Sequence, residues 1–248
     1  SVLPAFLILT KLDLRDHASS LIPDGIAPGK RGTCWTQSSG TTARPTKVLH
    51  SARSLGAFGR LKQREYRWFR LDPSGTFAGL RLPNHLPRRE DGTKLGFGES
   101  VRIDNWPNMH DFHTGPFVAS NLLSPVEDIF VWLERQSPDY LMTYAQSLER
   151  FAFAAEGQPA AKSLKALISI SEQLTPGMRV RVERSFGIPV HQNYGLNEIG
   201  LVAIRCEAGR YHVHTEHCLV EIVDEHGLPC ASGETGRIIV TALNNLSM

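Results

Sequence analysis

The sequence has few cysteines, and their spacing supports no disulfide framework. There are four in 248 residues, Cys34, Cys206, Cys218 and Cys230, and none forms a CxxC pair. Disulfide-stabilised secreted domains are short and rich in cysteine. Because no signal peptide is recognisable either, the scarcity predicts a chain that works in the reducing cytoplasm.

Long apolar runs are also lacking. No stretch approaches the roughly 18 residues that a membrane-spanning helix needs. Residues 2–10 are apolar but carry neither a basic leading segment nor a cleavage-like site, so we expect a short buried strand over residues 6–10. The sequence therefore predicts no membrane partner.

An excess of charge of one sign is lacking as well. Lys and Arg number 27 and Asp and Glu number 25, for a net charge of +2. Nucleic-acid-binding domains carry a marked basic surface, whereas the basic run at residues 87–89 is typical of a solvated loop. We expect no nucleic-acid partner and a soluble globular protein of one large domain or two lobes.

What the sequence has is an alternation of apolar strands and amphipathic helices. After the first predicted strand, further strands are expected at residues 46–50, 140–143, 166–170 and 190–193. Helices are expected at residues 51–71, at 147–156 and from Thr175 to Gly187, and another is expected to start with Ser124 as its cap and Pro125 at its first position. This alternation is typical of a largely parallel sheet with packed helices, so we predict an α/β lobe over residues 1–200.

The pattern changes beyond residue 200. Short apolar strands are expected at residues 201–205, 211–214, 219–223 and 237–241. Glycines that mark turns separate them, at Gly209, Gly227 and Gly233. Closely spaced strands without helices pair antiparallel. Residues 201–248 are therefore predicted to form a β-rich subdomain.

The first motif with chemical meaning is Ser-Ser-Gly-Thr-Thr-Ala-Arg-Pro-Thr at residues 38–46. Four hydroxyl residues flank one glycine, and they are Ser38, Ser39, Thr41 and Thr42 around Gly40. Successive backbone N–H groups in such a loop can form an anion-binding nest, to which the hydroxyls add donors. No Gly-Lys-Ser/Thr follows, so the loop is not a P-loop. The alternative is a flexible polar turn.

Two further motifs place carboxylates directly after predicted strands. Ser171 and Glu172 follow one strand, and Asn-Tyr-Gly-Leu-Asn-Glu at residues 193–198 follows the next. Open α/β sheets bind ligands at the carboxyl ends of their strands. Glu198 there could hold Mg²⁺ on a polyphosphate. Taken alone, each motif could also be a polar strand end.

The order of these motifs resembles the adenylate-forming superfamily, which includes acyl-CoA synthetases, luciferases and the adenylation domains of peptide synthetases. The Tyr-Gly-Leu-x-Glu form at residues 194–198 and Gly-Glu-Thr-Gly-Arg-Ile-Ile-Val-Thr at 233–241 look most like phenylacetate–CoA ligases. Residues 30–50 and 164–244 carry the resemblance. One departure is Ala43-Arg44-Pro45, where the family has Gly-Lys-Pro; Arg keeps a cation suited to phosphate.

The resemblance implies an ATP-dependent ligase that joins a carboxylic acid, an aryl acid first of all, to coenzyme A through an acyl-adenylate. Its implied catalytic residues are Glu198, Thr42 and Arg44, with Glu198 as the Mg²⁺ ligand. Residues 38–42 would cradle the phosphates of ATP. The adenine site and its surroundings would be lined by Ser171, Glu172, Asn193, Tyr194 and Gly195.

The acid substrate is expected to bind residues from the middle of the chain. Relatives place aromatic groups there, which makes Trp106, Phe112, His113 and Phe117 candidates. Ordinary core and loop aromatics are the alternative interpretation. A homodimer is compatible with the sequence.

A cluster of histidines and cysteines suggests a second metal. Cys206, His212, His214, His217 and Cys218 fall within thirteen residues, and Cys206 and Cys218 with His212 and His214 could hold tetrahedral Zn²⁺. His212, His214, Glu216 and Cys218 share a face of an extended strand by parity. The spacing fits no standard zinc finger, and four unrelated surface side chains are the alternative.

The resemblance also sets expectations for the ends and for rival functions. The chain stops before the family's Arg-Tyr-x-x-Asp segment and its C-terminal lid with a catalytic lysine, so we expect a fragment: the large N-terminal lobe without the lid, and without turnover by itself. One rival is a related enzyme that transfers the acyl group to a protein thiol. Another is a non-catalytic nucleotide-binding or scaffold relative.

Overall fold

The chain divides into two compact units. The computed structural model describes residues 8–22, 29, 32–37, 46–89, 91–109, 112–155 and 161–245. One unit comprises residues 62–194, and the other combines residues 1–61 with 195–248. Their boundaries fall inside helix α2 (Ala52–Trp68) and strand β8 (Val190–Leu196). The domain boundary predicted at residue 200 stays a prediction.

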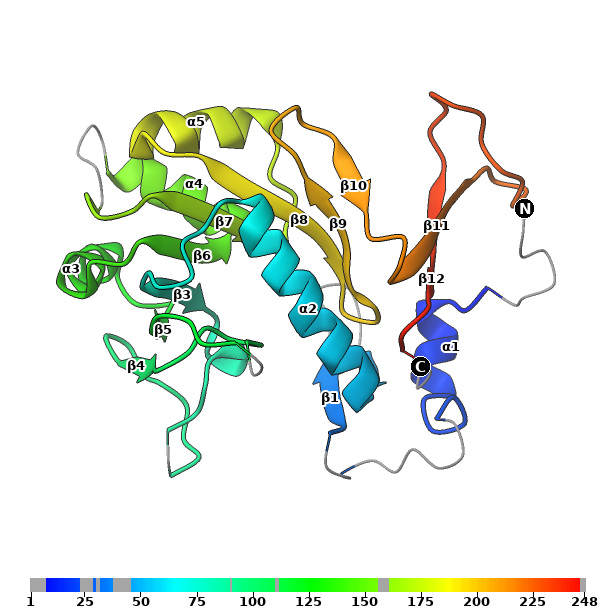
Figure 1. Ribbon diagram of the computed structural model, residues 1–248, viewed down its shortest axis with the longest axis horizontal. Coiled ribbons are helices and arrows are strands. Elements are labelled where there is room, and N and C mark those ends of the chain that lie inside the picture. The colour runs from blue at the N-terminus through cyan, green and yellow to red at the C-terminus, as the bar shows by residue number, and fades with distance from the viewer. Residues whose placement is uncertain are drawn as a thin grey trace. The chain divides into compact units, whose positions relative to one another are not determined.

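A mainly parallel sheet organises the unit formed by residues 62–194 (Figure 1). Its strands are β3 (Phe77–Arg81), β4 (Ser100–Ile103), β5 (Phe117–Asn121), β6 (Tyr140–Tyr144), β7 (Ala166–Ile170) and β8. Their order is β8-β7-β6-β3-β5-β4, and only the edge strand β4 runs antiparallel to its neighbour. The predicted α/β fold with a largely parallel sheet is confirmed.

Three helices cover one face of this sheet: α3 (Val126–Gln136), α4 (Ala145–Ala154) and α5 (Pro176–Phe186). Apolar side chains from the helices and strands form one buried cluster, which includes Leu133, Leu141, Leu148, Phe151 and Leu167. Burying such side chains stabilises the fold by about 1.5–3 kcal/mol each. This cluster therefore holds the three helices against the sheet.

The predicted ends of α5 are confirmed, and the predicted start of α3 is wrong in detail. Thr175 caps α5, accepting a hydrogen bond from the backbone N–H of Met178 at 3.2 Å, and Gly187 ends it with φ +69°. At α3 the cap position is Pro125, which has no capping side chain. Ser124 instead accepts a hydrogen bond from Gly98 N–H, because the loop before β4 packs there.

The opposite face holds an aromatic cluster at the amino ends of the parallel strands. Phe77 and Tyr140 begin β3 and β6, and Tyr66 and Trp106 contact them with ring centroids 5.1 to 6.2 Å apart. Four of these five contacts are edge-to-face, an arrangement that is favourable because ring edges are positive and faces negative. The short 3₁₀ helix η1 (Pro83–His85) follows β3 on the loop between the strands.

The other unit is built on antiparallel pairs, as predicted for the C-terminal region. Strand β1 (Cys34–Gln37) pairs with β2 (Lys47–His50), β9 (Gly200–Arg205) with β10 (Tyr211–Val213), and β11 (Cys218–Val223) with β12 (Arg237–Ala242). Gly209, Gly227 and Gly233 all have positive φ, which confirms the predicted turns between the strands.

The strand predicted over residues 6–10 is wrong for the residues that the structure describes there. Residues 8–10 are exposed and extended without strand pairing. Thr10 is the N-cap of a short helix, α1 (Lys11–Asp16), in a reciprocal capping box with Asp13. No helix among the described residues combines the length and apolar character that crossing a bilayer demands.

Candidate functional site

The predicted phosphate loop connects the strands of a hairpin. Ser38, Ser39, Gly40, Thr41, Thr42 and Arg44 lie outside the residues that the structure describes. The flanking strands are described, and Gln37 and Lys47 pair directly across β1 and β2. The hairpin therefore holds the two ends of the predicted loop together.

Glu198 lies on a tight turn between β8 and β9. The backbone N–H of Ile199 donates to the carbonyl of Leu196 at 3.2 Å, which closes the turn. The Glu198 side chain is half-buried, and no hydrogen bond or ion pair to it is found within the described part of the chain. Hard carboxylate oxygens are the ligands that Mg²⁺ prefers, and the role of Glu198 in holding the metal stays a prediction.

The backbone of the Glu198 turn is held from three directions. The carbonyl oxygen of Asn197 lies 3.0 Å from His50 Nε2, and that of Ile199 lies 2.8 Å from His217 Nε2. Between them, the carbonyl of Glu198 accepts a longer bond, 3.5 Å, from Asn245 Nδ2. Three successive carbonyls thus meet side chains from three distant segments of the sequence.

His50, the last residue of β2, is buried between polar groups. Its Nδ1 lies 3.1 Å from the hydroxyl of Ser54, and its Nε2 lies 3.1 Å from that of Thr36 as well as against Asn197. Burial is the main cause that lowers the pKa of His50 below its usual value, partly opposed by the bond to Asn197 and the charge of Glu198. The imidazole is therefore neutral near pH 7.

In the unit formed by residues 62–194, Glu172 has a partner of its own. Its Oε2 accepts a hydrogen bond from the backbone N–H of Gln146 at 2.9 Å. Gln146 is in the first turn of α4, whose own cap residue, Tyr144, provides no capping side chain. Glu172 thus caps this helix, where a negative charge also interacts favourably with the helix dipole. Ser171 beside it is exposed and has φ +61°.

Asn193 also contacts a buried group. Its Nδ2 donates to Glu65 Oε2 at 3.0 Å. Glu65 is fully buried, and its other oxygen lies 2.8 Å from Lys62 Nζ. The pair of Lys62 and Glu65 was not predicted from the sequence, because both residues lie on α2 and look like surface charges of an amphipathic helix. Asn193 and Tyr194 lie on β8, the neighbour of strand β7, after which Glu172 comes. Gly195 and Glu198 belong to the other compact unit.

A second pair missed by sequence reasoning is found at the carboxyl ends of β3 and β6. Arg81 Nε donates to the hydroxyl of Tyr144 at 3.2 Å, and the guanidinium lies 5.3 Å from the centre of the same ring. Both residues end their strands. Predicting strand β3 from the sequence would have revealed Arg81, because it lies at the carboxyl end of this strand, where parallel sheets bind ligands.

Two of the aromatic residues predicted to bind the acid, Trp106 and Phe117, lie at the amino ends of the parallel strands and not at the carboxyl ends. Phe117 begins β5, and Trp106 packs beside the first residues of β3 and β6. Both are at most 3% exposed, and Trp106 Nε1 donates to the carbonyl of Gly75. They are core residues at the amino ends of the strands. Phe112 is half-buried and His113 is exposed on the loop before β5.

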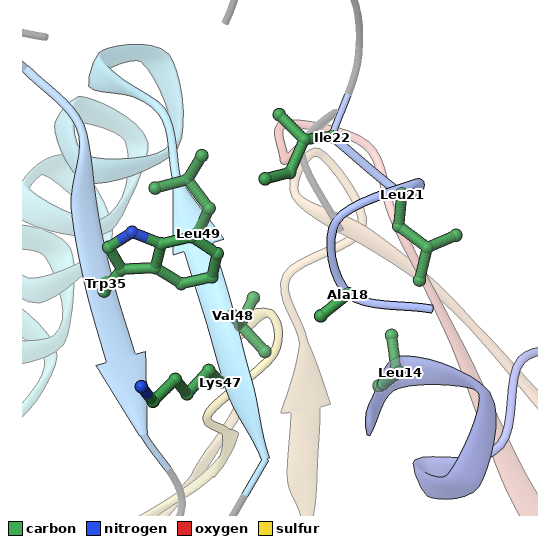
Figure 2. Close-up of a pocket in the computed structure, with 8 residues that line it drawn as sticks. All are labelled: Leu14, Ala18, Leu21, Ile22, Trp35, Lys47, Val48 and Leu49. Carbon is green, nitrogen blue, oxygen red and sulfur yellow. The ribbon is translucent and has the colours of Figure 1, made fainter. Parts of the chain in front are cut away.

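An apolar hollow between α1 and the β1–β2 hairpin is too small for a substrate. Figure 2 shows its lining, which is Leu14, Ala18, Leu21, Ile22, Trp35, Lys47, Val48 and Leu49. The free space accommodates about one water molecule. We interpret the hollow as a packing defect of the small core between the hairpin and α1.

The structure does not bring the four predicted zinc ligands together. The four are all described, and no group of three or more potential metal ligands is found among the described residues. Strand parity failed as a guide because the residues are on different elements: Cys206 follows β9, His212 is exposed on β10, His214 is buried after it, and Cys218 begins β11.

Comparison with known proteins identifies similar enzymes. No protein-family model matches the chain. Phenylacetate-coenzyme A ligase of Thermus thermophilus is 27% identical in an alignment of 253 positions that covers 99% of this chain and 53% of that protein. The Escherichia coli enzyme of the same name is 25% identical over 98% of this chain and 54% of its own length. The chain thus spans about half the length of the curated relatives it matches.

Solved structures agree with this likeness at the level of the fold. A 2-hydroxyisobutyryl-CoA ligase in complex with 2-HIB-AMP and CoA matches with a TM-score of 0.69 and 16% identity, over 97% of this chain and 55% of that one. An anthranilate CoA ligase in complex with anthranoyl-AMP matches with a TM-score of 0.62 and 16% identity, over 86% and 40%. In sequence over nearly its whole length and in fold, the chain therefore resembles the adenylate-forming CoA ligases, and phenylacetate–CoA ligase in particular.

Proposed function

We propose that the whole protein is an ATP-dependent carboxylic acid–CoA ligase that acts through an acyl-adenylate. The observation that carries the proposal is the Glu198 turn. Its carboxylate has no partner within the described residues, while three side chains hold its backbone. A turn whose backbone is fixed while its carboxylate keeps free oxygens suits a preorganised ligand site.

In the proposed reaction, a carboxylate oxygen of the acid attacks the α-phosphorus of ATP, and the bond to the bridging oxygen breaks. The products are an acyl-adenylate and pyrophosphate. A thiol then attacks the acyl carbon, and AMP leaves with the electron pair of the broken C–O bond. The protein contributes mainly positioning and charge stabilisation.

The roles of the residues follow from their chemistry. Backbone N–H groups and hydroxyls of residues 38–42 would donate to the phosphates, and Arg44 would add a cation. Glu198, together with Thr42, would hold Mg²⁺, which neutralises phosphate charge. Tyr194 would lie flat against the nucleotide or the acyl group. Glu172 and Asn193 would orient the strand ends at the adenine site, through Gln146 and Glu65.

We further propose an aryl acid as substrate and coenzyme A as acceptor. The curated relatives are named for phenylacetate, and one structural neighbour is an anthranilate ligase. Another neighbour acts on 2-hydroxyisobutyrate, so the fold alone does not favour an aromatic acid. The higher sequence similarity to the phenylacetate enzymes supports the aryl assignment.

Product analysis tests the proposal. The whole protein is incubated with ATP, Mg²⁺, CoA and one acid at a time: phenylacetate, anthranilate or 2-hydroxyisobutyrate. We expect AMP, pyrophosphate and the acyl-CoA of an aryl acid, identified by mass spectrometry. Formation of ADP would contradict the adenylate route. An acyl-adenylate that forms but acylates only the phosphopantetheine thiol of a carrier protein would replace CoA by a protein acceptor.

A further inference from the structure

The β1–β2 hairpin connects the two motifs assigned to ATP. Its loop is the predicted phosphate loop, between the paired residues Gln37 and Lys47. Its opposite end carries His50, paired with Cys34 and bonded to the carbonyl of Asn197 in the Glu198 turn. The β1–β2 hairpin therefore flanks the predicted phosphate loop and is bonded to the Glu198 turn. All of these residues belong to the same compact unit.

The partners of His50 set the direction of its hydrogen bonds. Asn197 offers a carbonyl oxygen, which only accepts, so His50 Nε2 must carry the proton. Nδ1 then accepts from the hydroxyl of Ser54. Thr36, on the other strand of the hairpin, lies 3.1 Å from the same Nε2. Groups on β1, on α2 and in the turn thus fix the ring.

His217 repeats the arrangement on the other side of the turn. Asn244 Nδ2 lies 3.3 Å from its Nδ1 and donates to it, so Nε2 carries the proton and donates to the carbonyl of Ile199 at 2.8 Å. His217 is 1% exposed and His50 is 6% exposed. Hydrogen bonds this well shielded from water keep one geometry, because breaking them would leave a buried carbonyl unpaired.

We propose that His50 and His217 are positioning residues that fix the Glu198 turn relative to the hairpin of the phosphate loop. Neither touches the reacting atoms. They act through the carbonyls on either side of Glu198, so that its carboxylate is in place before MgATP binds. A displacement of about 1 Å in such a group can cost roughly 100-fold in rate. The inference rests on the role of Glu198 proposed above.

The test uses the whole protein with His50→Ala, which removes the donor, and His50→Gln, whose amide N–H can replace Nε2–H. The matched control is His226→Gln, an exposed histidine at a turn between β11 and β12. Hydrogen–deuterium exchange is followed in the peptide covering residues 195–201. The Mg²⁺ concentration for half-maximal pyrophosphate exchange is measured alongside.

We expect His50→Ala to exchange the amides of the turn at least about 10-fold faster and to need at least about 10-fold more Mg²⁺, with most of both effects reversed in His50→Gln. Unchanged exchange and unchanged Mg²⁺ demand in His50→Ala would overturn the proposal. If His50→Ala does not fold, Thr36→Val and Ser54→Ala loosen the ring without removing it, with the same expected direction.

A Glu198→Gln variant distinguishes the proposed role of Glu198 from the proposed role of His50. If its Mg²⁺ demand equals that of the wild type, the proposed role of Glu198 fails, whatever His50→Ala does. If Glu198→Gln loses pyrophosphate exchange while His50→Ala behaves like the wild type in both measurements, the role of Glu198 stands and the positioning role of His50 is wrong.

Discussion

Asn193 Nδ2 lies 3.0 Å from Glu65 Oε2, so a residue of the predicted adenine site is bonded to a fully buried carboxylate. The other oxygen of Glu65 is paired with Lys62 at 2.8 Å. A buried carboxylate needs several donors to offset its lost hydration. Asn193 therefore stabilises the middle of β8 besides any contact with a nucleotide.

Replacing Asn193 should therefore destabilise the fold. We expect Asn193→Ala to lower the free energy of unfolding by about 1–3 kcal/mol, because it leaves Glu65 with one donor fewer. Asn193→Asp should cost more at pH 7, since it sets two carboxylates against each other. Chemical denaturation measures both, with Asn84→Ala on the exposed helix η1 as control. Equal stability of the three variants would contradict the structural role.

Removal of Glu172 should loosen the start of α4. We expect Glu172→Ala to lower stability by about 0.5–2 kcal/mol, the usual effect of losing a helix cap, and Glu172→Gln to lose less because its amide oxygen still accepts from Gln146. Thermal melting measures the stabilities of the wild type, Glu172→Gln and Glu172→Ala, which should decrease in that order. If Glu172→Ala melts at the wild-type temperature but weakens ATP binding, the side chain serves the nucleotide and not the helix.

The glycine of the Tyr-Gly motif is explained by packing. A Cβ on Gly195 would lie 2.9 Å from the carbonyl oxygen of Gly200, a backbone atom that cannot move away easily. We expect Gly195→Ala to destabilise the protein by about 1–3 kcal/mol through overpacking. Gly177→Ala in α5 is the matched control, because a Cβ there meets nothing within 4 Å, and it should be neutral or stabilising. Similar effects of both substitutions would contradict the explanation.

Thiol labelling distinguishes the cysteines. Cys34 is exposed, whereas Cys218 is buried and desolvation raises its pKa. We expect iodoacetamide to modify Cys34 first and to spare Cys218 until the protein unfolds, since the thiolate is the reactive form. Above pH 8.5 or so the unfolded chain ionises this thiol while the folded chain keeps the proton, so Cys218 should lower stability as the pH rises. Early labelling of Cys218 would contradict its placement.

The sequence predicts well those elements that have a distinct period and clear ends. Strand β7 and helix α5 were expected at their observed positions, because Thr175 and Gly187 mark the helix ends and residues 166–170 are a short apolar run. Strands β3 and β5 were missed. Both are buried on both faces, so neither alternates, and both contain small residues that lower strand propensity.

The site could be predicted only as far as the motifs reach. Glu198 and Asn193 were predicted because the Asn-Tyr-Gly-Leu-Asn-Glu motif has a recognisable place in the order of the motifs, and their roles in binding stay predictions. The hydrogen bonds of His50 and His217 to the Glu198 turn could not be predicted, because they join residues 147 and 18 positions apart in the sequence. The burial of Trp106 and Phe117 at the amino ends of the strands could not be predicted either, because their positions depend on strands that the sequence did not reveal.

The most direct test of the account is acid-dependent exchange of labelled pyrophosphate into ATP, compared between the whole protein and its Glu198→Gln variant. The account predicts exchange in the wild type only when a carboxylic acid and Mg²⁺ are present. In Glu198→Gln it predicts a loss of at least about 100-fold, the scale seen when a key electrostatic group is removed, with an unchanged melting temperature. Equal exchange by the two proteins at saturating Mg²⁺ would contradict it.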